Sequence, residues 1–219
     1  MITKTLGTIY WLGLSLSLAA SAFGQEAKPL YKNDFQQAAL DKVPEDLLVL
    51  DGAFAVKEEQ GNKFLELPGT PLDTFGALFG PSEKDGVQAT ARVFGTSRGR
   101  RFPTFALGLN GVAGYRVQVS PGKKLLELYR GDSVKASIPY TWSSGRWTHL
   151  RLQVRKTSDG WTIEAKAWQE GKDEPAGWMI TTTDKEELPA GRASIFGSPF
   201  SDTPIQFDDL IVTRIGSGP

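Results

Sequence analysis

Short runs of alternating apolar and polar residues, each ended by Gly, Pro, Asn or Asp, constrain the fold of this chain more than any other feature. A period of two predicts strands with one buried face, and the frequent turn residues favour antiparallel connections over βαβ units. About a dozen such runs predict an all-β, two-sheet antiparallel β-sandwich. Helix is expected only at Gln36–Leu40, with one further helical turn at Asp184–Leu188. The clearest runs are Phe54–Lys57, Lys63–Leu67, Gly76–Phe79, Val87–Phe94, Phe102–Leu109, Tyr115–Val119, Leu125–Tyr129, Trp147–Arg155, Trp161–Trp168, Ala193–Phe196 and Ile205–Thr213.

The N-terminus has the pattern of a cleaved secretory signal. Lys4 precedes an apolar run, and Ala22-Phe23-Gly24 places small residues at positions −3 and −1 ahead of Gln25. An uncleaved membrane anchor is the alternative, but it needs ~20 apolar residues, and Gly and Ser interrupt this run. We therefore expect residues 1–24 to be a signal peptide and residues 25–219 to be a single domain. We also expect export to the periplasm or the extracellular space, without membrane association after cleavage.

The composition narrows the classes of partner. The chain has 25 basic and 25 acidic residues, a balance with no bias toward nucleic acid or anionic membrane. It has no cysteine, so an exported domain would depend on a large hydrophobic core instead of disulfides. The one basic cluster, "SRGRRF" at residues 97–102, fits a solvated turn, or a site that attracts a sulfated or uronic-acid glycan.

One hairpin can be predicted in register. "WTHLRLQVR" and "WTIEAKAW" both alternate strictly, and Asp159-Gly160 between them is typical of a type I′ turn, in which both central residues need positive φ. A two-residue turn there pairs Val154 with Ala165 and Leu152 with Ala167, so that apolar side chains share one face.

The same register predicts the polar face of this hairpin. Arg151 would lie opposite Trp168, where a cation–π contact stabilises the pair, and His149 would lie opposite Glu170. Gln153 would lie on that face opposite Lys166. Trp168 is thereby predicted to point away from the core of its own sheet.

Three stretches of the C-terminal third carry a family resemblance: "GRWTHLRLQVRKTSDGWTIEAKAW", "WQEGKDEPAGW" and "LPAGRASIFG…IQFDDLIVTRI". They resemble the penultimate hairpin, the connection after it and the closing pair of strands in the concanavalin A-like lectin/glucanase superfamily. The branch that they resemble is the LamG-like jelly roll of exported bacterial proteins. The resemblance implies a jelly-roll sandwich with a carbohydrate-facing surface on its concave sheet or at the rim.

Known catalytic constellations are not matched. Laminarinase-type relatives carry Glu-x-Asp-x-(x)-Glu on one strand, whereas the nearest match, Glu83-Lys84-Asp85, lacks the third carboxylate and lies in a turn-like segment. The sequence has no cysteine nucleophile and no Gly-x-Ser-x-Gly elbow, and its single His excludes His-rich zinc sites. No catalytic residue is assigned, and whether the protein is an enzyme stays open.

Outward-facing residues of the predicted strands are the candidates for carbohydrate binding. An indole stacks on the apolar face of a sugar ring, while Arg and Gln side chains bind hydroxyls or carboxylates. The alternative is that such residues only cover an ordinary solvated sheet face, and that His149 belongs to a cross-strand polar pair rather than acting as a base or hydroxyl partner. The candidates are Arg116, Gln118, Trp147, His149, Arg151, Gln153 and Trp168.

Asp208 and Asp209 interrupt an otherwise apolar last strand. At least one is expected to point inward, where an unpaired carboxylate is costly. It would then accept backbone N–H bonds or help to bind a cation. The resemblance implies a structural calcium ion held by Asp209 and by Asp34 near the first strand; calcium takes six to eight oxygen ligands. No other cofactor is expected.

Three functional classes follow. The first, which the resemblance without a recognisable catalytic constellation favours over the other two, is a non-catalytic, lectin-like domain that binds polysaccharide or glycoconjugate. The second is a glycoside hydrolase or polysaccharide lyase of the same superfamily. The third is a structural or adhesion protein of the cell envelope, whose protein partner the sequence does not identify.

Overall fold

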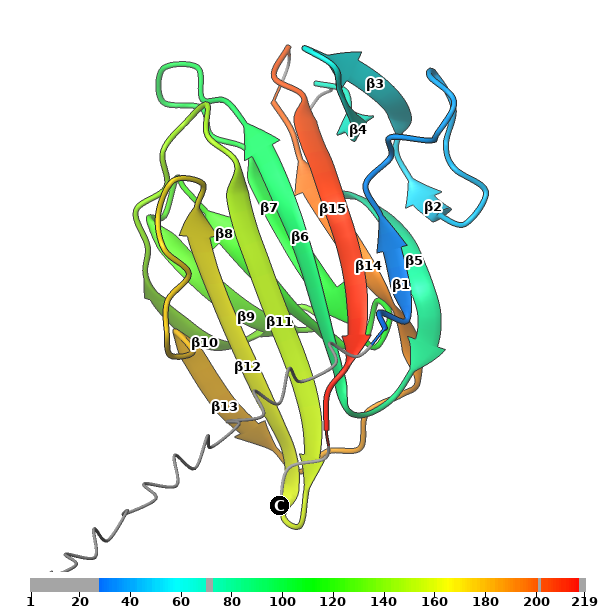
Figure 1. Cartoon of the computed structure of the whole chain (residues 1–219). Helices are drawn as coiled ribbons and strands as arrows, with labels where there is room; N and C mark the ends of the chain where they lie inside the picture. Colours follow the sequence, from blue (N-terminus) through cyan, green and yellow to red (C-terminus); the bar gives the residue numbers. More distant parts are fainter. Residues whose placement is uncertain (1–27, 70–72, 201, 217–219) are drawn as a thin grey trace, which may run out of the picture.

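The computed structural model describes residues 28–69, 73–200 and 202–216, and it confirms the all-β sandwich. Two antiparallel sheets stack face to face, and Figure 1 views them from the side of the larger sheet. The larger sheet contains β1 (Tyr31–Asn33), β3 (Ala55–Glu59), β4 (Asn62–Leu67), β6 (Val87–Gly95), β11 (Thr148–Thr157), β12 (Gly160–Gln169), β13 (Ile180–Asp184) and β15 (Ile205–Arg214). The smaller sheet contains β2 (Leu48–Asp51), β5 (Phe75–Glu83), β7 (Thr104–Leu109), β8 (Tyr115–Ser120), β9 (Leu125–Arg130), β10 (Ser133–Pro139) and β14 (Gly191–Ser198).

The strand order shows a jelly-roll topology in which sequence neighbours often change sheet. The larger sheet runs β13-β12-β11-β6-β15-β4-β3, with β1 also paired to β15, and the smaller sheet runs β10-β9-β8-β7-β14-β5-β2. The last two strands, β14 and β15, therefore lie in different sheets and do not pair with each other. The four strands that form the middle of the larger sheet (β12, β11, β6 and β15) lie side by side in Figure 1 and position the site described below.

The two helix predictions are wrong for the described chain. Residues 36–40 form turns, and residues 184–188 pass from the end of β13 into loop. Phe35 is the physical reason at the first position: its side chain is 1% exposed in the core, its φ is +58°, and the chain reverses direction around it. The Gln36 side chain then donates to the Lys63 carbonyl at 3.1 Å, which ties this turn to β4. Nowhere in the described ranges is there a helix of the length and hydropathy that a membrane crossing needs.

The β11–β12 hairpin forms, but its predicted register is off by two residues. Thr157 pairs with Gly160, so the turn is Ser158-Asp159. Neither Ser158 nor Asp159 has positive φ, and the following Gly160 has a φ of +137°, so the type I′ turn that centres on Asp159-Gly160 does not occur. Because the shift is even, each side chain keeps its predicted face, and Leu150, Leu152 and Val154 are fully buried between the sheets.

The corrected register changes the partners on the outer face. His149 pairs with Trp168, Arg151 with Lys166, and Gln153 with Glu164. The predicted direct pairs are therefore wrong: Arg151 with Trp168, His149 with Glu170, Gln153 with Lys166, Val154 with Ala165, and Leu152 with Ala167. Trp168 does lie on the outer face, as predicted, where it is only partly buried.

Candidate functional site

A cavity of 480 Å³ opens at one end of the outer face of the larger sheet. We call it the aromatic pocket. Its lining comes from the β3–β4 hairpin, from β6 and β15, and from the segments just before β11 and just after β12, so five regions of the sequence meet here. The lining residues are Glu59, Gln60, Asn62, Phe64, Arg92, Phe94, Trp147, Glu170 and Gln206.

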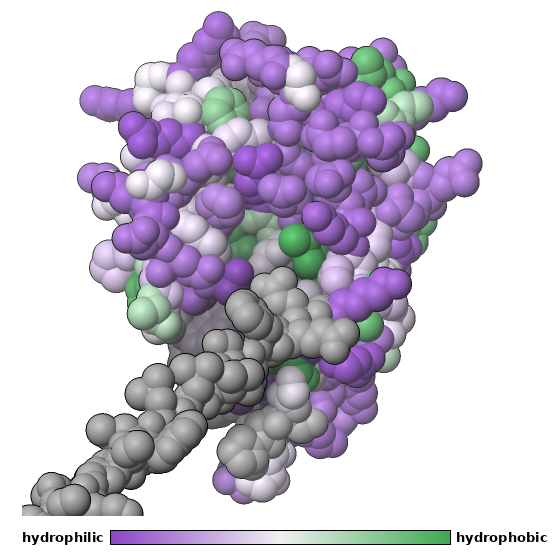
Figure 2. Space-filling view, viewed as in Figure 1, coloured by the Kyte–Doolittle hydropathy of each residue, from purple (hydrophilic) through white to green (hydrophobic). Residues whose placement is uncertain are grey.

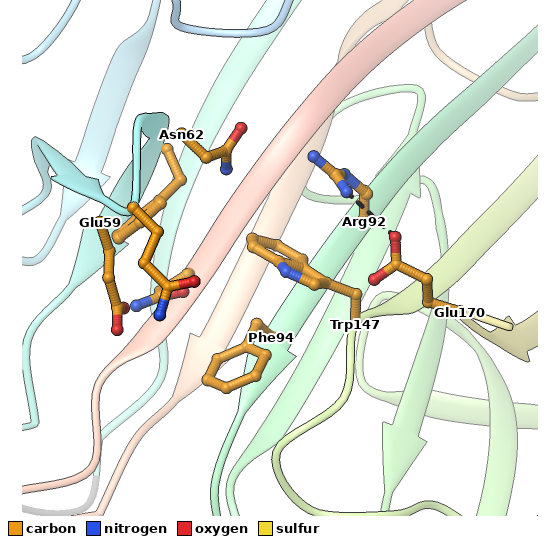
Figure 3. A pocket seen from close by; sticks show the side chains of 9 residues that line it. Glu59, Asn62, Arg92, Phe94, Trp147 and Glu170 are labelled. Carbon is orange, nitrogen blue, oxygen red and sulfur yellow. Dashed lines mark hydrogen bonds and ion pairs between the residues drawn. The ribbon is translucent and has the colours of Figure 1, made fainter.

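Trp147 is the centre of this pocket. Figure 3 shows its indole with Phe94 on one side, Arg92 and Glu170 on the other, and Glu59 and Asn62 facing it from the β3–β4 hairpin. Its ring centroid lies 5.5 Å from that of Phe94 and 6.4 Å from that of Phe64, in a tilted and an edge-on arrangement. Phe64 is buried although it does not belong to the core between the sheets, because it lies on the outer face among these aromatic rings. The result is a small apolar floor on an otherwise polar face.

Arg92 connects this floor to a group of carboxylates. Its Cζ lies 4.7 Å from the Trp147 ring centroid, a cation–π geometry. Its Nη2 lies 2.7 Å from Asp208 Oδ2, its Nε lies 2.7 Å from Asp209 Oδ2, and its Nη1 lies 3.4 Å from Glu170 Oε1. The guanidinium is thus fixed against the indole on one side and neutralised by carboxylates on the others.

A β-bulge places both aspartates of the last strand beside Arg92. Pairing of β15 with β6 shifts between Asp208 and Ile211, and Asp209 has a φ of +49°. A bulge lets two consecutive residues face the same side of a sheet. Neither carboxylate enters the core, so the expectation of an inward-facing aspartate is wrong. Asp208 is 1% exposed on the outer face, where burial raises the pKa of its carboxyl and Asn62 donates to it at 3.0 Å.

A second cavity, of 280 Å³, continues from Arg92 along the same face; we call it the middle cavity. Its side wall is made by His149, Trp168 and Arg151. The imidazole stacks on the indole with ring centroids 5.0 Å apart and an interplanar angle of 8°, and Arg151 Cζ lies 5.6 Å from the same indole. Burial lowers the pKa of His149, although Glu170 opposes the shift, so burial favours the neutral imidazole.

A third cavity, of 570 Å³, which we call the basic cavity, shares Lys32, Thr90, Arg151 and Ile211 with the middle cavity. Gln88, Thr213 and Arg214 extend it toward the opposite end of β6 and β15. Because each cavity shares lining residues with the next, the three lie in a row along these two strands, and we call this row of cavities the groove. Figure 2 shows this face of the molecule to be mostly hydrophilic.

The structure brings together only part of the predicted binding set. Trp147 lines the aromatic pocket, and His149, Arg151 and Trp168 line the middle cavity. Gln153 lies on the same face but outside the groove: it is buried and donates to Glu164 at 2.5 Å.

The two remaining predicted residues, Arg116 and Gln118, belong to β8 of the smaller sheet and so face the opposite side of the sandwich. Arg116 Cζ lies 4.8 Å from the Tyr129 ring, and Gln118 donates to Ser120 Oγ at 3.0 Å. They do not join the groove residues in one platform.

Several groove residues were not predicted. Arg92 and Phe94 occupy the outward positions of "VQATARVFG", so the alternation that identified this strand also carried the signal for them. Lys32, Asn62 and Glu59 come from other segments, and their place at the groove depends on strand pairings that no local pattern encodes.

Asp34 and Asp209, the predicted calcium ligands, each have another partner in the structure. Asp209 is paired with Arg92, and Asp34 Oδ1 accepts a bond from the Gln36 backbone N–H at 3.3 Å. In the residues that the structure describes, no group of three or more His, Cys, Asp or Glu side chains is placed to hold a metal ion.

No protein-family model matches the chain, and no curated protein matches it. Solved structures do match in fold. A Bacillus subtilis protein of unknown function with a galectin-like fold has a TM-score of 0.60 at 11% identity, over 86% of this chain and 98% of that one. The calcium-bound exoplasmic/lumenal domain of VIP36 has a TM-score of 0.60 at 11% identity, over 88% and 93%. Lectin II from Ulex europaeus has a TM-score of 0.56 at 12% identity, over 86% and 100%. The sandwich is thus of the lectin-like, concanavalin A type.

Proposed function

We propose that this protein is an exported, non-catalytic domain that binds polysaccharide or glycoconjugate in the groove of its larger sheet. The observation that carries the proposal is the aromatic pocket. In it, a partly exposed Trp147 lies among side chains that can hydrogen-bond to sugar hydroxyls.

The lining of the pocket suits a sugar ring. Trp147 and Phe94 offer apolar faces for stacking on the C–H face of a pyranose. Asn62 and Gln206 supply amide donors and acceptors, and Glu59 and Glu170 supply acceptors, all around the same 480 Å³ space. A few polar groups converging on an apolar floor are typical of small-ligand sites.

The pocket is also held in place before any ligand arrives. Most of its side chains project from strands, and Arg92 is fixed by carboxylates on three of its nitrogens. Rigid placement lowers the entropic cost of binding. The lectin-like fold supports the same proposal, while export rests on the N-terminal pattern and the LamG-like branch rests on the C-terminal motifs.

The test is affinity electrophoresis of the purified protein in gels that contain a panel of polysaccharides. Trp147→Ala should abolish the retardation. Phe196→Ala is the matched control, because Phe196 is a partly buried aromatic on the outer face of the other sheet and should leave binding unchanged. If no polysaccharide retards the protein, or if both variants behave alike, the proposal is wrong.

One observation favours a second candidate function. Glu59 and Glu170 line the aromatic pocket from opposite sides, as Figure 3 shows, and glycoside hydrolases use two carboxyl groups that flank the scissile bond. A reducing-end assay on the same samples decides between the two. New reducing ends that disappear in Glu170→Gln would replace the binding proposal with a hydrolase.

A further inference from the structure

The two ends of the groove carry opposite charge, and we infer that its ligand is a glycan with an anionic substituent, held at the basic cavity. The inference deepens the proposed function and rests on it. It names the chemical class of the ligand as a saccharide that bears a carboxylate or a sulfate some distance from an uncharged sugar ring.

The aromatic end is acidic. Its single cation, Arg92, is surrounded by Glu170, Asp208 and Asp209, and Glu59 lines the same pocket. Carboxylates thus outnumber the arginine here, and each nitrogen of its guanidinium lies within 3.4 Å of a carboxylate oxygen, although its Nε forms no hydrogen bond with the residues that the structure describes. An anionic sugar at this end would face repulsion, so the ring that stacks on Trp147 is uncharged.

The opposite end is basic. Lys32, Arg151 and Arg214 line the basic cavity, and no acidic residue lines it with them. Two of these cations have a carboxylate partner outside the cavity lining: Arg214 pairs with Glu83 at 2.9 Å, and Arg151 pairs with Glu174 at 2.6 Å.

These carboxylates do not neutralise the basic end. Glu174 is shared, because Lys166 Nζ also lies 2.7 Å from the same Oε1 atom. Among the residues that the structure describes, Lys32 forms no ion pair. The Nε of Arg151 is buried and has no hydrogen-bond partner among those residues. Arg151, Arg214 and Lys166 therefore share two carboxylates and Lys32 has none, which leaves an excess of positive charge and an unused donor at this end.

One ligand can reach both ends. The middle cavity shares Arg92 with the aromatic pocket and Lys32, Thr90, Arg151 and Ile211 with the basic cavity. From Phe94 to Gln88, β6 extends about 20 Å at the usual rise of ~3.4 Å per residue. This length exceeds one sugar ring, so an oligosaccharide that stacks on Trp147 extends past His149 toward Lys32.

The chemistry of the basic end matches carboxylate and sulfate oxygens. Guanidinium groups donate paired N–H bonds to such oxyanions, and lysine adds a point charge. Along a groove these charges act together and attract an anion more strongly than any one of them alone. The basic cluster at residues 97–102 is not part of this arrangement, since its Arg100 and Phe102 line a separate 220 Å³ cavity with Gln118 of β8.

The experiment measures dissociation constants for matched polymer pairs by isothermal titration calorimetry at low salt. One pair is polygalacturonate and its methyl ester, which isolates the carboxylate. The other pair is dextran sulfate and dextran, which isolates the sulfate. Each polymer is titrated into the wild-type protein and into Lys32→Glu, Trp147→Ala and Lys124→Glu. Lys124 lies in the turn between β8 and β9 of the smaller sheet and matches the charge change of Lys32→Glu far from the groove.

We expect the anionic member of a pair to bind at least ~10-fold more tightly than its neutral partner. Lys32→Glu should remove that preference and Lys124→Glu should keep it, while Trp147→Ala should weaken both members. Equal or better binding of the neutral member, or equal effects of the two lysine variants, overturns this inference and leaves the proposed function standing. Binding that survives Trp147→Ala, or the absence of binding to every polymer, contradicts the proposed function itself.

Discussion

Arg92 and Trp147 join the charged and aromatic parts of the groove, with the guanidinium carbon 4.7 Å from the indole centroid. Removing the guanidinium would leave Asp208 buried without its cation, and breaking a buried pair in this way typically costs ~3–5 kcal/mol. Since Arg92 is itself 19% exposed, we expect Arg92→Met to lower the free energy of unfolding by about 3 kcal/mol in urea denaturation at pH 7.

The same variant has a predicted pH dependence. Burial already raises the pKa of Asp208, and loss of the arginine raises it further. A folded-state pKa above the unfolded value gives stability that is present at low pH and lost as pH rises. The loss of unfolding free energy in Arg92→Met, relative to the wild type, should therefore become smaller as the pH falls from 7 to 4. The double variant Arg92→Met/Asp208→Asn should regain part of this free energy at pH 7. A deficit independent of pH would contradict this account of the pair.

Asp184 should govern the acid sensitivity of the fold. It ends β13 of the larger sheet, where Tyr115 of β8 donates to it and Arg130 of β9 lies 2.7 Å away, so this contact joins the two sheets. Burial opposes its ionisation, but these bonds and the Glu186 backbone N–H outweigh burial and lower its pKa from 3.8 to about 2.

Because its folded-state pKa is depressed, Asp184 contributes stability that is fully present above pH 4 and is lost as pH falls toward 2. The shift corresponds to about 2 kcal/mol. Asp184→Asn should lower the unfolding free energy at pH 6, and the gap to wild type should close between pH 4 and pH 2. Thermal unfolding of both proteins, monitored by circular dichroism between pH 6 and pH 2, measures this difference in stability. Asp159→Asn, the same change at an exposed turn position, is the control. A difference in stability between Asp184→Asn and the wild type that persists at pH 2 would refute the assignment.

His149 is the only histidine of the chain, so its titration can be followed as one imidazole signal by NMR. Burial against Trp168 lowers its pKa below the ordinary value of 6.5. We expect a titration midpoint below 6.5 in the wild type. The midpoint should fall further in Glu170→Gln, because Glu170 favours the protonated ring. A midpoint at or above 6.5, or a rise in Glu170→Gln, would show that the imidazole is not held as described.

Local periodicity predicted the strands and their faces, because burial of one face follows from a period of two. It did not predict the register of the β11–β12 hairpin, because Gly160 takes the positive φ alone and moves the turn back to Ser158-Asp159. The even shift preserved the faces, so His149, Arg151 and Trp168 were correctly placed on the outer surface.

Only some of the residues that line the groove could be predicted from the sequence. Trp147 was identified from its own strand, whereas Asn62 and Lys32 reach the groove through the pairing of β4 and β1 with β15. Those pairings join residues far apart in the chain. The bulge at Asp208 and Asp209 could not be predicted from the sequence either. Two consecutive aspartates are equally compatible with one inward and one outward side chain and with two outward side chains.

Export predicts a defined mature N-terminus. Cleavage after Gly24 would leave Gln25 as the first residue of the protein recovered from the host's periplasm or medium. Intact-mass measurement should give the mass of residues 25–219, including the loss of ammonia if the N-terminal glutamine cyclises. Ala22→Arg, which places a large charged residue at position −3, should cause the uncleaved precursor to accumulate. A full-length protein in the cytoplasm would contradict the signal.

Calcium should leave the stability of this protein unchanged. A ligand that binds only the folded state increases the free energy of unfolding by RT ln(1 + [L]/Kd) and so raises the melting temperature. Asp209, the predicted ligand on the last strand, already has its Oδ2 2.7 Å from Arg92 Nε, and a divalent cation would have to enter beside that positive charge. We therefore expect the same melting temperature in EDTA and in about 1 mM Ca²⁺.

The variant to compare with the wild type is Arg92→Met, because it removes the cation beside Asp208 and Asp209. Calcium sensitivity that the wild type lacks is expected only in this variant. A calcium-dependent rise in the wild type, abolished by Asp34→Asn or Asp209→Asn, would instead establish the two carboxylates as ligands and show that the guanidinium moves aside.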